Sequence, residues 1–308
     1  MTKIFIDGSS GTTGLRIRER LAERKDIELI TVPYELRHEP DVRKEAIHNA
    51  DIAFLCLPDA AAKESALLAE GSDTVIIDTS TAHRTAEGWV YGLPELEGQR
   101  EKIRTSKRIA NPGCHATGFI ALVQPLIKAG ILKDDIHLTC MSLTGYSGGG
   151  KKMIAEYELA DRDSYLDSPR MYGLTQNHKH LKEMKIISGL KYDPVFCPVV
   201  ADFYSGMETV IPLFADEING TAADILHVYE QLYAGSLIGI ADTARANMIP
   251  ANLMALRDDM RISIQGNEER ILLTAVFDNL GKGASGAAIQ NMNIVMGTEE
   301  TTGLVTGE

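Results

Sequence analysis

Cysteine is scarce in this chain, which contains four among 308 residues. They lie far apart and form no Cys-x-x-Cys pair, so the sequence indicates neither a disulfide framework nor a zinc or other metal site. Long apolar runs are also lacking, since none reaches the roughly 18 residues of a membrane-spanning helix. Met1-Thr2-Lys3 passes directly into the apolar Ile4-Phe5-Ile6, without the basic and apolar leader of a secreted protein. We therefore expect a cytoplasmic protein with no membrane partner.

Positive charge is in deficit. Lysine and arginine number 31 against 43 aspartates and glutamates, a formal net charge of −12. We expect no nucleic-acid partner, because no basic face is visible to neutralise phosphates, whereas a small anionic ligand needs only local basic residues. A hydrophobic fraction of 44% is ordinary for a globular protein, and 308 residues predict two domains.

The N-terminal segment carries a nucleotide-binding pattern. Lys3 to Asp7 predicts a strand, a glycine-rich turn follows, and Leu15 to Arg24 predicts an amphipathic helix. This order is typical of the first unit of a Rossmann-type domain, in which backbone N–H groups and the helix N-terminus face a pyrophosphate. The spacing is Gly-x-x-Gly-x-x-Gly, a weak pattern, and a purely structural turn is the alternative. The expected cofactor-binding residues of the turn are Gly8, Ser10, Gly11, Thr12, Thr13 and Gly14.

A second predicted strand, Ile27 to Val32, precedes residues that would distinguish NAD from NADP. Glu35 could accept a hydrogen bond from the ribose 2′-hydroxyl of NAD. Arg37 or Arg43 could instead pair with the 2′-phosphate of NADP. These residues alone leave both cofactors open.

Strands and helices continue to alternate. Asp51 to Leu57 predicts a strand buried on both faces, Pro58 opens a helix that runs to about Glu70, and Thr74 to Asp78 predicts another strand. The alternation predicts an α/β fold with a parallel sheet. Ser80 and Arg84 follow the end of the last of these strands, where ligands bind to such sheets, so we expect them near cofactor or substrate. A solvated loop is the alternative.

One cysteine stands at a predicted helix start. A short strand, Lys107 to Ala110, leads into Asn111-Pro112-Gly113-Cys114-His115-Ala116-Thr117-Gly118, and the apolar run from Phe119 to Ile127 predicts a buried helix. At a helix N-terminus the N–H groups and the dipole favour a thiolate, so Cys114 is the candidate nucleophile. An inert buried thiol is the alternative. Apolar, strand-like runs surround the other three cysteines, which are expected in the core: Cys56, Cys140 and Cys197.

The motif from Asn111 to Gly118 resembles the active-site signature of the N-acetyl-γ-glutamyl-phosphate reductases, relatives of the aspartate-semialdehyde dehydrogenases. That family also has the glycine spacing described above and a segment like Tyr91 to Glu95, so the similarity to its short type covers nearly the whole chain. Its Ser-Ala-Asp-Phe-Arg loop is here Ser80-Thr81-Ala82-His83-Arg84. The resemblance implies NADP as cofactor, substrate contacts for Asn111 and Arg84, and a homo-oligomer, either a dimer or a tetramer.

A second glycine-rich loop follows a predicted strand, His137 to Thr144. It runs from Gly145 to Lys152, and its three consecutive glycines let N–H groups approach an anion while two lysines supply charge. A flexible loop is the alternative. The family has a similar loop that ends in a basic residue, so the resemblance implies that Ser147 and Lys151 hold the substrate phosphate.

Two histidines flank Lys179 in a polar segment that begins at Tyr172. His178 and His180 fit poorly with a core, and if the segment is extended they point to the same side. The family has a His-Lys/Arg-His motif with an upstream tyrosine. The resemblance therefore implies that His178 is the acid/base partner of Cys114 and that Tyr172 and His180 contact the substrate, although the family's following Pro-Glu is Lys182-Glu183 here.

The C-terminal half predicts a different sheet. Residues 197–203 and 207–214 are predicted to pair, residues 221–233 to form a helix, and residues 261–266 and 271–278 to form two more strands of a mixed sheet. In related dehydrogenases the last helix, here 287–296, returns to the nucleotide domain, which places Asn279 and Lys282 at the nicotinamide. Residues 298–308 are expected to fray. The expected domains are residues 1–113 with about 280–308, which bind NADP, and the catalytic α+β domain of residues 114–279.

The predicted activity is reduction of an acyl phosphate. Cys114 attacks the carbonyl and releases phosphate, NADPH reduces the thioester, and His178 moves the proton. The resemblance indicates N-acetyl-γ-glutamyl phosphate, an intermediate of arginine biosynthesis, whereas the residues leave an aspartyl or aminoadipyl phosphate open, and they do not identify the oxyanion donors. A Cys–His hydrolase or acyltransferase would leave the N-terminal turn unused. A nucleotide-binding regulator would leave Cys114 and the histidines unused.

Overall fold

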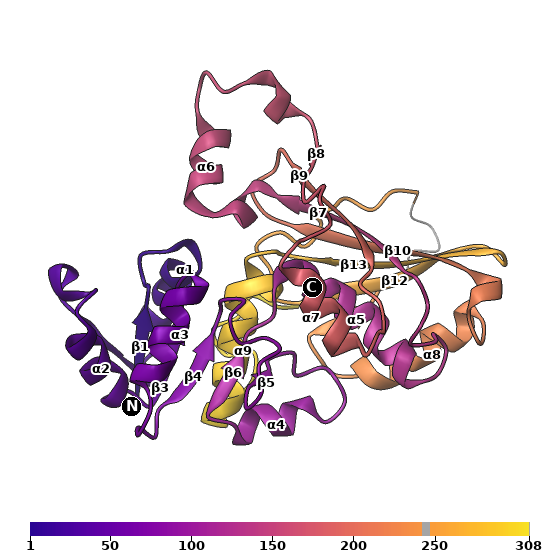
Figure 1. The fold of residues 1–308 in the computed structure, drawn as a ribbon. Helices are drawn as coiled ribbons and strands as arrows, with labels where there is room; N and C mark the ends of the chain where they lie inside the picture. Colours follow the sequence, from indigo (N-terminus) through magenta and orange to yellow (C-terminus); the bar gives the residue numbers. More distant parts are fainter. Residues whose placement is uncertain (242–246, 308) are drawn as a thin grey trace. The chain divides into compact units, whose positions relative to one another are not determined.

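The computed structural model describes residues 1–241 and 247–307, and the chain divides into two compact units (Figure 1). Unit 1 comprises Met1–Pro94, Gly98–Gly113 and Ala284–Leu304. Unit 2 comprises Glu95–Glu97, Cys114–Gly283 and Val305–Glu308. Glu308, the end of the expected tail, lies outside the described residues. Each unit is built on its own sheet.

Unit 1 contains a parallel sheet with six strands in its described residues. In spatial order they are β2 (Ile27–Ile30), β1 (Thr2–Asp7), β3 (Ile52–Leu55), β4 (Val75–Asp78), β6 (Arg108–Ala110) and β5 (Val90–Tyr91). The chain runs from β1 to β2 on one side and then to β3 on the other, so the strand order reverses between β1 and β3. Ligands of such sheets bind outside the carboxyl ends of the strands at this switch point.

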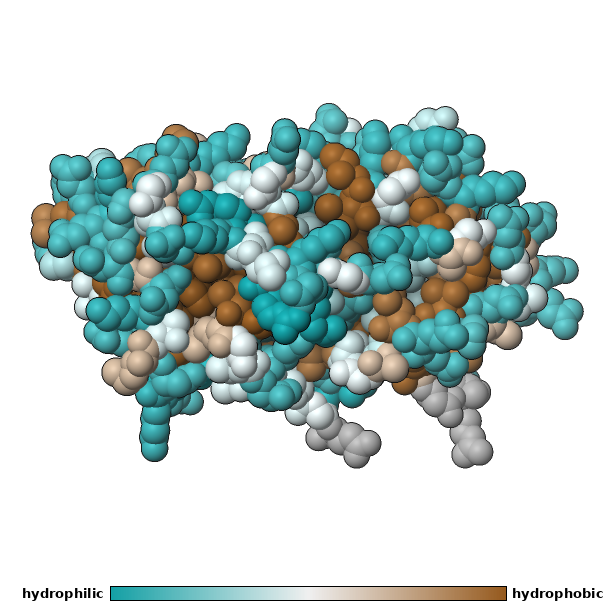
Figure 2. Space-filling model, turned by 90° about the horizontal axis from the view of Figure 1, so that it is seen from below, coloured by the Kyte–Doolittle hydropathy of each residue, from teal (hydrophilic) through white to brown (hydrophobic). Residues whose placement is uncertain are grey.

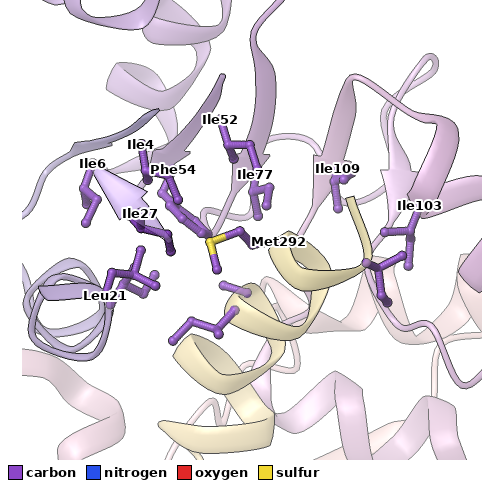
Figure 3. Packing of buried hydrophobic residues seen from close by; sticks show 14 residues of the cluster. Ile4, Ile6, Leu21, Ile27, Ile52, Phe54, Ile77, Ile103, Ile109 and Met292 are labelled. Atoms are coloured by element: carbon purple, nitrogen blue, oxygen red, sulfur yellow. The ribbon is translucent and has the colours of Figure 1, made fainter. Parts of the chain in front are cut away.

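Helices bury this sheet. They are α1 (Thr12–Ala22), α2 (Pro40–His48), α3 (Asp59–Leu68), α4 (Gln99–Thr105) and α9 (Gly286–Met296), with a short 3₁₀ helix η1 (Tyr34–Leu36) after β2. Figure 3 shows Met292 of α9 beside Phe54 and Ile77 of the sheet. All four residues of β3 are buried, as expected of a parallel strand covered on both faces.

Unit 2 contains a mixed sheet, and its described strands are seven. In spatial order they are β11 (Ile238–Ile240), β12 (Met260–Gly266), β13 (Arg270–Phe277), β10 (Met207–Phe214), β7 (Thr139–Gly145), β9 (Val195–Ala201) and β8 (Arg170–Met171). The neighbours from β12 to β7 are antiparallel, whereas β7 and β9 are parallel. A parallel Rossmann-type sheet and a second, mixed sheet confirm the predicted fold class.

The central helix of unit 2 is α5. The helices of this unit are α5 (Cys114–Lys128), α6 (Gly150–Glu158), α7 (His180–Ser188) and α8 (Ala222–Tyr233), with short 3₁₀ helices η2 (Tyr146–Gly149), η3 (Ser164–Asp167) and η4 (Ala215–Glu217). α5 packs on β10 and β13 and contacts α7 and α8, and every residue from His115 to Leu126 is buried. Tyr229 and Tyr233 of α8 donate their hydroxyls to α5 carbonyls, at 2.6 Å each. The packing of α5 therefore fixes the position of its first residue, Cys114.

The predicted pairing of residues 197–203 with 207–214 is wrong. β7 lies between β9 and β10 and pairs with both. The connection after β9 bonds to the end of β7: Gly145 donates its N–H to the Gly206 carbonyl and Tyr146 to the Phe203 carbonyl, at 3.0 and 2.9 Å. These hydrogen bonds insert β7 between two strands that are consecutive in the sequence.

Two other local expectations also differ from the structure. The segment around His178 is not extended, because Gln176 has a φ of 56° and α7 begins at His180, so strand alternation does not orient these rings. The C-terminal segment is held rather than frayed at Val305, whose N–H donates to Oδ2 of Asp258 and whose carbonyl accepts the Asp258 N–H, both at 2.8 Å.

The surface is largely polar where it can be seen. On the face drawn in Figure 2, hydrophilic residues predominate and hydrophobic residues lie between them in small groups. Within the described ranges, no helix has both the length and the apolar character that crossing a membrane requires.

Candidate active site

Cys114 begins α5, as predicted, and is partly exposed. The backbone of Gly283 packs against it, because a Cβ built on Gly283 would lie only 3.0 Å from the Cβ of Cys114. Gly283 belongs to a π-helical turn, Gly281–Ser285, and its N–H donates to the carbonyl of Asp278 at 2.9 Å. A side chain at position 283 would press on the cysteine, so glycine leaves space beside the thiol.

The other thiols differ from Cys114 in their surroundings. Burial raises the pKa of Cys56 to about 12, and the nearby Asp78 carboxylate also raises it. Burial likewise raises the pKa of Cys140, in β7. Cys197 lies within β9 and is partly exposed. Of the four, Cys114 is the one at a helix N-terminus, where a thiolate is favoured.

His115, beside Cys114, is the centre of a buried polar cluster. Its Nδ1 lies 2.7 Å from Oγ of Ser142, and its Nε2 lies 2.6 Å from the hydroxyl of Tyr172. Oγ of Ser142 also lies 3.2 Å from Oγ1 of Thr209. Burial, with a smaller effect of His178, lowers the pKa of His115 from 6.5 to about 3. The imidazole is therefore neutral at neutral pH.

Four aromatic rings lie around His115 within the described residues. The ring centroids of Tyr172, His178, His180 and Phe196 lie 6.1, 5.9, 5.6 and 5.3 Å from that of His115, respectively. Nδ1 of His178 accepts the backbone N–H of His180 at 3.3 Å, so a neutral His178 carries its proton on Nε2. Burial, and secondarily Lys179, lowers the pKa of His178. This partly exposed imidazole is a neutral donor at physiological pH.

Tyr172 links this cluster to the cysteine. Burial raises the pKa of Tyr172, and the charge of Cys114 raises it further, so the two side chains are within electrostatic reach. The structure thus brings together four of the predicted site residues: Cys114, Tyr172, His178 and His180.

Sequence reasoning missed the residues that connect these groups. His115 was noted only as a neighbour of Cys114, and Ser142, Thr209 and Phe196 were not singled out. The available signal was polarity at inward positions of strands, since Ser142 and Thr209 are both fully buried. Their meeting depends on the β7–β10 pairing, in which Ser142 lies opposite Thr209.

Ser147 lies in η2, directly after β7, and is buried. Its Oγ accepts a hydrogen bond from Nδ2 of Asn279 at 3.0 Å, and Oδ1 of Asn279 accepts the N–H of Gly206 at 2.9 Å. The short segment from Asn279 to Gly283 therefore contacts the Ser147 loop at one end and Cys114 at the other. Lys151, in the first turn of α6, is exposed and forms no ion pair within the described residues.

The N-terminal turn is tightly closed. Thr12, Thr13 and Gly14 form the first turn of α1, and Ser9 and Ser10 lie in the loop before it. A Cβ on Gly8 would lie 2.3 Å from the Cys56 carbonyl oxygen, and one on Gly14 would lie 2.4 Å from the Gly8 carbonyl oxygen. Gly11, the N-cap, provides no side chain to the first-turn N–H groups. This geometry fits the close approach of a pyrophosphate.

The two arginines after β2 differ. Arg43 is buried and donates to Oδ2 of Asp7 at 3.1 Å and to Oε1 of Glu64 at 2.9 Å, so it is not available for a ribose phosphate. Arg37 stacks on the ring of Tyr34, 3.5 Å from the centroid, and stays partly exposed. Glu35 is exposed in η1.

The loop after β4 is organised by Asp78. This buried carboxylate accepts hydrogen bonds from the N–H and hydroxyl of Ser80, at 2.9 and 2.7 Å, and lies 2.6 Å from Nδ1 of His83. Arg84 is buried and donates to the carbonyls of Asn111 and Thr79, at 3.0 and 3.1 Å. In this structure Arg84 therefore holds the loop to the end of β6.

Asn111 also has backbone and side-chain partners in unit 1. Its N–H donates to the Asp78 carbonyl at 2.7 Å, its Nδ2 to the Ala284 carbonyl at 2.9 Å, and its Oδ1 accepts from Asn291 at 3.2 Å. Lys282, expected at the nicotinamide, is fully buried and donates to Oε1 of Glu95 at 2.6 Å. Across the described ranges, no group of three or more metal-ligating side chains occurs.

Two family models match the chain. Residues 114–279 match "Semialdehyde dehydrogenase, dimerisation domain", and residues 32–106 match "Semialdehyde dehydrogenase, NAD binding domain". The chain is 45% identical over 306 residues to an N-acetyl-gamma-glutamyl-phosphate reductase from Brucella ovis, covering 96% of this chain and 99% of that protein. The reductase from Brucella canis is equally similar, at 45% identity over the same shares of both chains.

Solved structures share the fold. Aspartate semialdehyde dehydrogenase II from Vibrio cholerae, complexed with ASA, aligns with a TM-score of 0.71 at 16% identity, over 96% of this chain and 98% of that one. The enzyme from Francisella tularensis aligns with a TM-score of 0.68 at 15% identity, over 96% and 100%. At such identities the likeness concerns the fold alone.

Proposed function

Because the chain belongs to the N-acetyl-γ-glutamyl-phosphate reductase family, we propose that it reduces N-acetyl-γ-glutamyl phosphate to N-acetylglutamate 5-semialdehyde and phosphate, with NADPH as reductant. The observation that carries the proposal is Cys114 at the start of α5 with Tyr172 and a histidine cluster beside it. In this proposal the protein acts in arginine biosynthesis in the cytoplasm.

Cys114 is the nucleophile of the proposed reaction. Its sulfur attacks the acyl carbon, the bond to the phosphate oxygen breaks, and a thioester forms. A nicotinamide cofactor, when bound, would supply the hydride that reduces the thioester carbon. The resulting alkoxide re-forms a carbonyl and expels the sulfur, which returns Cys114 to the thiolate. The first turn of α5 stabilises the thiolate at both ends of the cycle.

The overall reaction consumes one proton, which the departing phosphate takes. We assign its delivery to His178, the partly exposed member of the histidine cluster. For this transfer His178 first takes up a proton from solvent, and the resulting imidazolium gives one proton to the departing phosphate and becomes neutral again. In the reverse direction neutral His178 accepts a proton from inorganic phosphate and becomes the imidazolium. His180 and Tyr172 line the same cluster and are proposed to contact the substrate.

The phosphate group is proposed to bind at the loop after β7. Lys151 supplies positive charge to a chain with a net charge of −12, and no carboxylate within the described residues neutralises it. Ser147 supplies a hydroxyl that Asn279 orients. Asn111 and Arg84 remain proposed substrate residues, supported by their place after the carboxyl ends of β6 and β4.

The chain has a nicotinamide-dinucleotide binding domain, and we propose NADP as the specific cofactor. The proposed pyrophosphate site comprises Gly8, Ser10, Gly11, Thr12, Thr13 and Gly14. Arg37 is the proposed partner of the 2′-phosphate, since its guanidinium is partly exposed after β2 while Arg43 is engaged by carboxylates. The residues proposed on the nicotinamide side of the cofactor are Ser80, Asn279 and Lys282. Lys282 is buried in an ion pair with Glu95, so its proposed role is to position the neighbouring backbone.

We propose that unit 2 forms a homodimer through the outer face of its mixed sheet. Apolar side chains are exposed there on adjacent strands, with Met141, Phe214 and Leu272 at 43%, 57% and 41% exposure. Met141 pairs with Val210, and Leu272 pairs with Pro212. Val210, Pro212 and Phe214 are alternate residues of β10, so the three exposed side chains lie on the same face of the sheet. The match of residues 114–279 to a dimerisation-domain model supports this assignment.

The test is phosphate-dependent reduction of the oxidised cofactor by N-acetylglutamate 5-semialdehyde, followed by nucleotide absorbance. NADP should be preferred over NAD, and aspartate semialdehyde should be turned over at least about 10²-fold less efficiently, because the site must recognise the longer N-acetylated chain. Activity without phosphate would indicate a different acyl acceptor. Equal use of aspartate semialdehyde would contradict the proposed substrate.

A further inference from the structure

We propose that three buried residues, Thr209, Ser142 and His115, form a directed hydrogen-bond chain. The chain ends at the hydroxyl of Tyr172 and leaves its proton free to donate to the acyl carbonyl oxygen at Cys114. This inference rests on the function proposed above and names the oxyanion donor and the residues that orient it.

The chain is continuous and shielded from water. Thr209 and Ser142 are fully buried and His115 is 2% exposed. The three links measure 3.2 Å from Thr209 to Ser142, 2.7 Å from Ser142 to His115, and 2.6 Å from His115 to Tyr172. Since His115 is neutral, one of its ring nitrogens donates and the other accepts. All protons in the chain must therefore point in one of two directions.

Thr209 decides the direction. Within the described residues, the hydrogen-bond partner of its hydroxyl is Ser142. If Thr209 donates to Ser142, then Ser142 donates to Nδ1 of His115 and every buried proton has an acceptor. In the opposite direction, Ser142 donates to Thr209, and the hydroxyl proton of Thr209 is left in the core without a hydrogen-bond acceptor. A buried donor without an acceptor disfavours that direction by roughly 10- to 100-fold in population.

The favoured direction fixes the state of Tyr172. With Nδ1 accepting, Nε2 of His115 carries the proton and donates it to the Tyr172 oxygen. The phenolic proton is then not used inside the chain and points to another acceptor. Burial raises the pKa of Tyr172 and keeps it protonated. Its hydroxyl lies 2.6 Å from Nε2 of His115, the residue that directly follows Cys114 in the first turn of α5. A fixed donor at the carbonyl oxygen stabilises the alkoxide formed after attack and after hydride transfer.

The proton direction can be read from the imidazole of His115 by NMR of protein labelled with ¹⁵N-histidine. The expected spectrum shows a proton on Nε2 and none on Nδ1, and the His115 signals are identified by their shift in Tyr172→Phe. A proton on Nδ1, or equal occupancy of both nitrogens, would overturn the proposal. This measurement does not depend on activity.

Kinetics test the consequence for catalysis. Tyr172→Phe should lower kcat by about 10²-fold, the usual effect of losing one oxyanion donor, with little change in KM. Ser142→Ala removes the group that makes Nδ1 an acceptor and should lower kcat roughly tenfold. When Ser142→Ala is added to Tyr172→Phe, kcat should fall almost no further, because the hydroxyl proton that Ser142 helps to orient is absent. Ser263→Ala, at a buried serine of β12 outside the chain, is the matched control and should leave kcat unchanged.

The outcomes are separable. An equal loss from Ser142→Ala in both backgrounds would show that Ser142 acts only structurally and would overturn the chain. A wild-type protein without acyl-phosphate reductase activity would contradict the proposed function, while the NMR result would still decide the proton direction. If Ser142→Ala does not fold, the wild-type NMR result and the kcat of Tyr172→Phe decide the proposal.

Discussion

Acid should destabilise unit 2 through His115 before most carboxylates titrate. Burial holds the pKa of this imidazole at about 3 in the folded chain, against an unfolded value of 6.5. At pH values between these two pKa values, the imidazole of His115 is protonated in the unfolded chain and neutral in the folded chain. The stability that neutral His115 contributes is therefore fully present above pH 6.5 and is lost as the pH falls toward about 3.

The size of this effect follows from the width of that window. At about 1.36 kcal/mol per pH unit, the full interval corresponds to about 5 kcal/mol, and the part between pH 6.5 and about 5 to about 2 kcal/mol. Such a loss is a large fraction of the ~5–15 kcal/mol that stabilises a typical domain.

The assay compares urea denaturation of the wild type and of His115→Gln, at several pH values from about 7.5 to about 5. Glutamine can still hydrogen-bond but does not titrate, so the difference in free energy of unfolding between the two proteins isolates His115. Circular dichroism follows the whole chain, and fluorescence of Trp89, the single tryptophan, follows unit 1 as an internal control. The difference should shrink by about 2 kcal/mol over the acidic part of the range. Parallel pH dependences would show that His115 is not held neutral by burial, and would refute the reasoning.

Three other perturbations probe other parts of the account. Gly14→Val should raise the KM for NADP by at least about tenfold, because a Cβ there meets the Gly8 carbonyl at 2.4 Å; unchanged cofactor affinity would remove the turn from the cofactor site. Lys151→Ala should weaken phosphate use about 10- to 100-fold while NADP binding is kept, with Lys152→Ala as the neighbouring control; equal losses for both ligands would argue against a phosphate site. Leu272→Glu should shift the protein toward monomer in analytical ultracentrifugation, and an unchanged mass would exclude this face as the interface.

Local sequence signals predicted the elements that carry the chemistry. Pro112 and Gly113 before a long apolar run predict a helix that starts at Cys114, and α5 begins there. Thr221, at the start of the predicted helix 221–233, is the N-cap of α8 and forms a capping box with Asp224. These signals act over a few residues, so they can be read without knowledge of the fold.

Long-range relations escaped the sequence. The position of β7 between β9 and β10 depends on hydrogen bonds of residues 203–206, which no periodicity encodes. The same pairing sets Ser142 opposite Thr209, and so the environment of His115 could not be derived. The ion pair of Lys282 with Glu95 joins residues 187 positions apart, so the sequence could not show that this lysine is buried and paired with a carboxylate.

The central claim is that the acyl group passes through a covalent bond to Cys114. Rapid mixing of the protein with N-acetyl-γ-glutamyl phosphate in the absence of nucleotide, followed by acid quench and peptide mass spectrometry, tests it directly. We predict release of about one phosphate per chain and an acyl adduct on the Cys114 peptide, with neither in Cys114→Ser. A phosphate burst that persists in Cys114→Ser, or an adduct on another residue, would contradict the account.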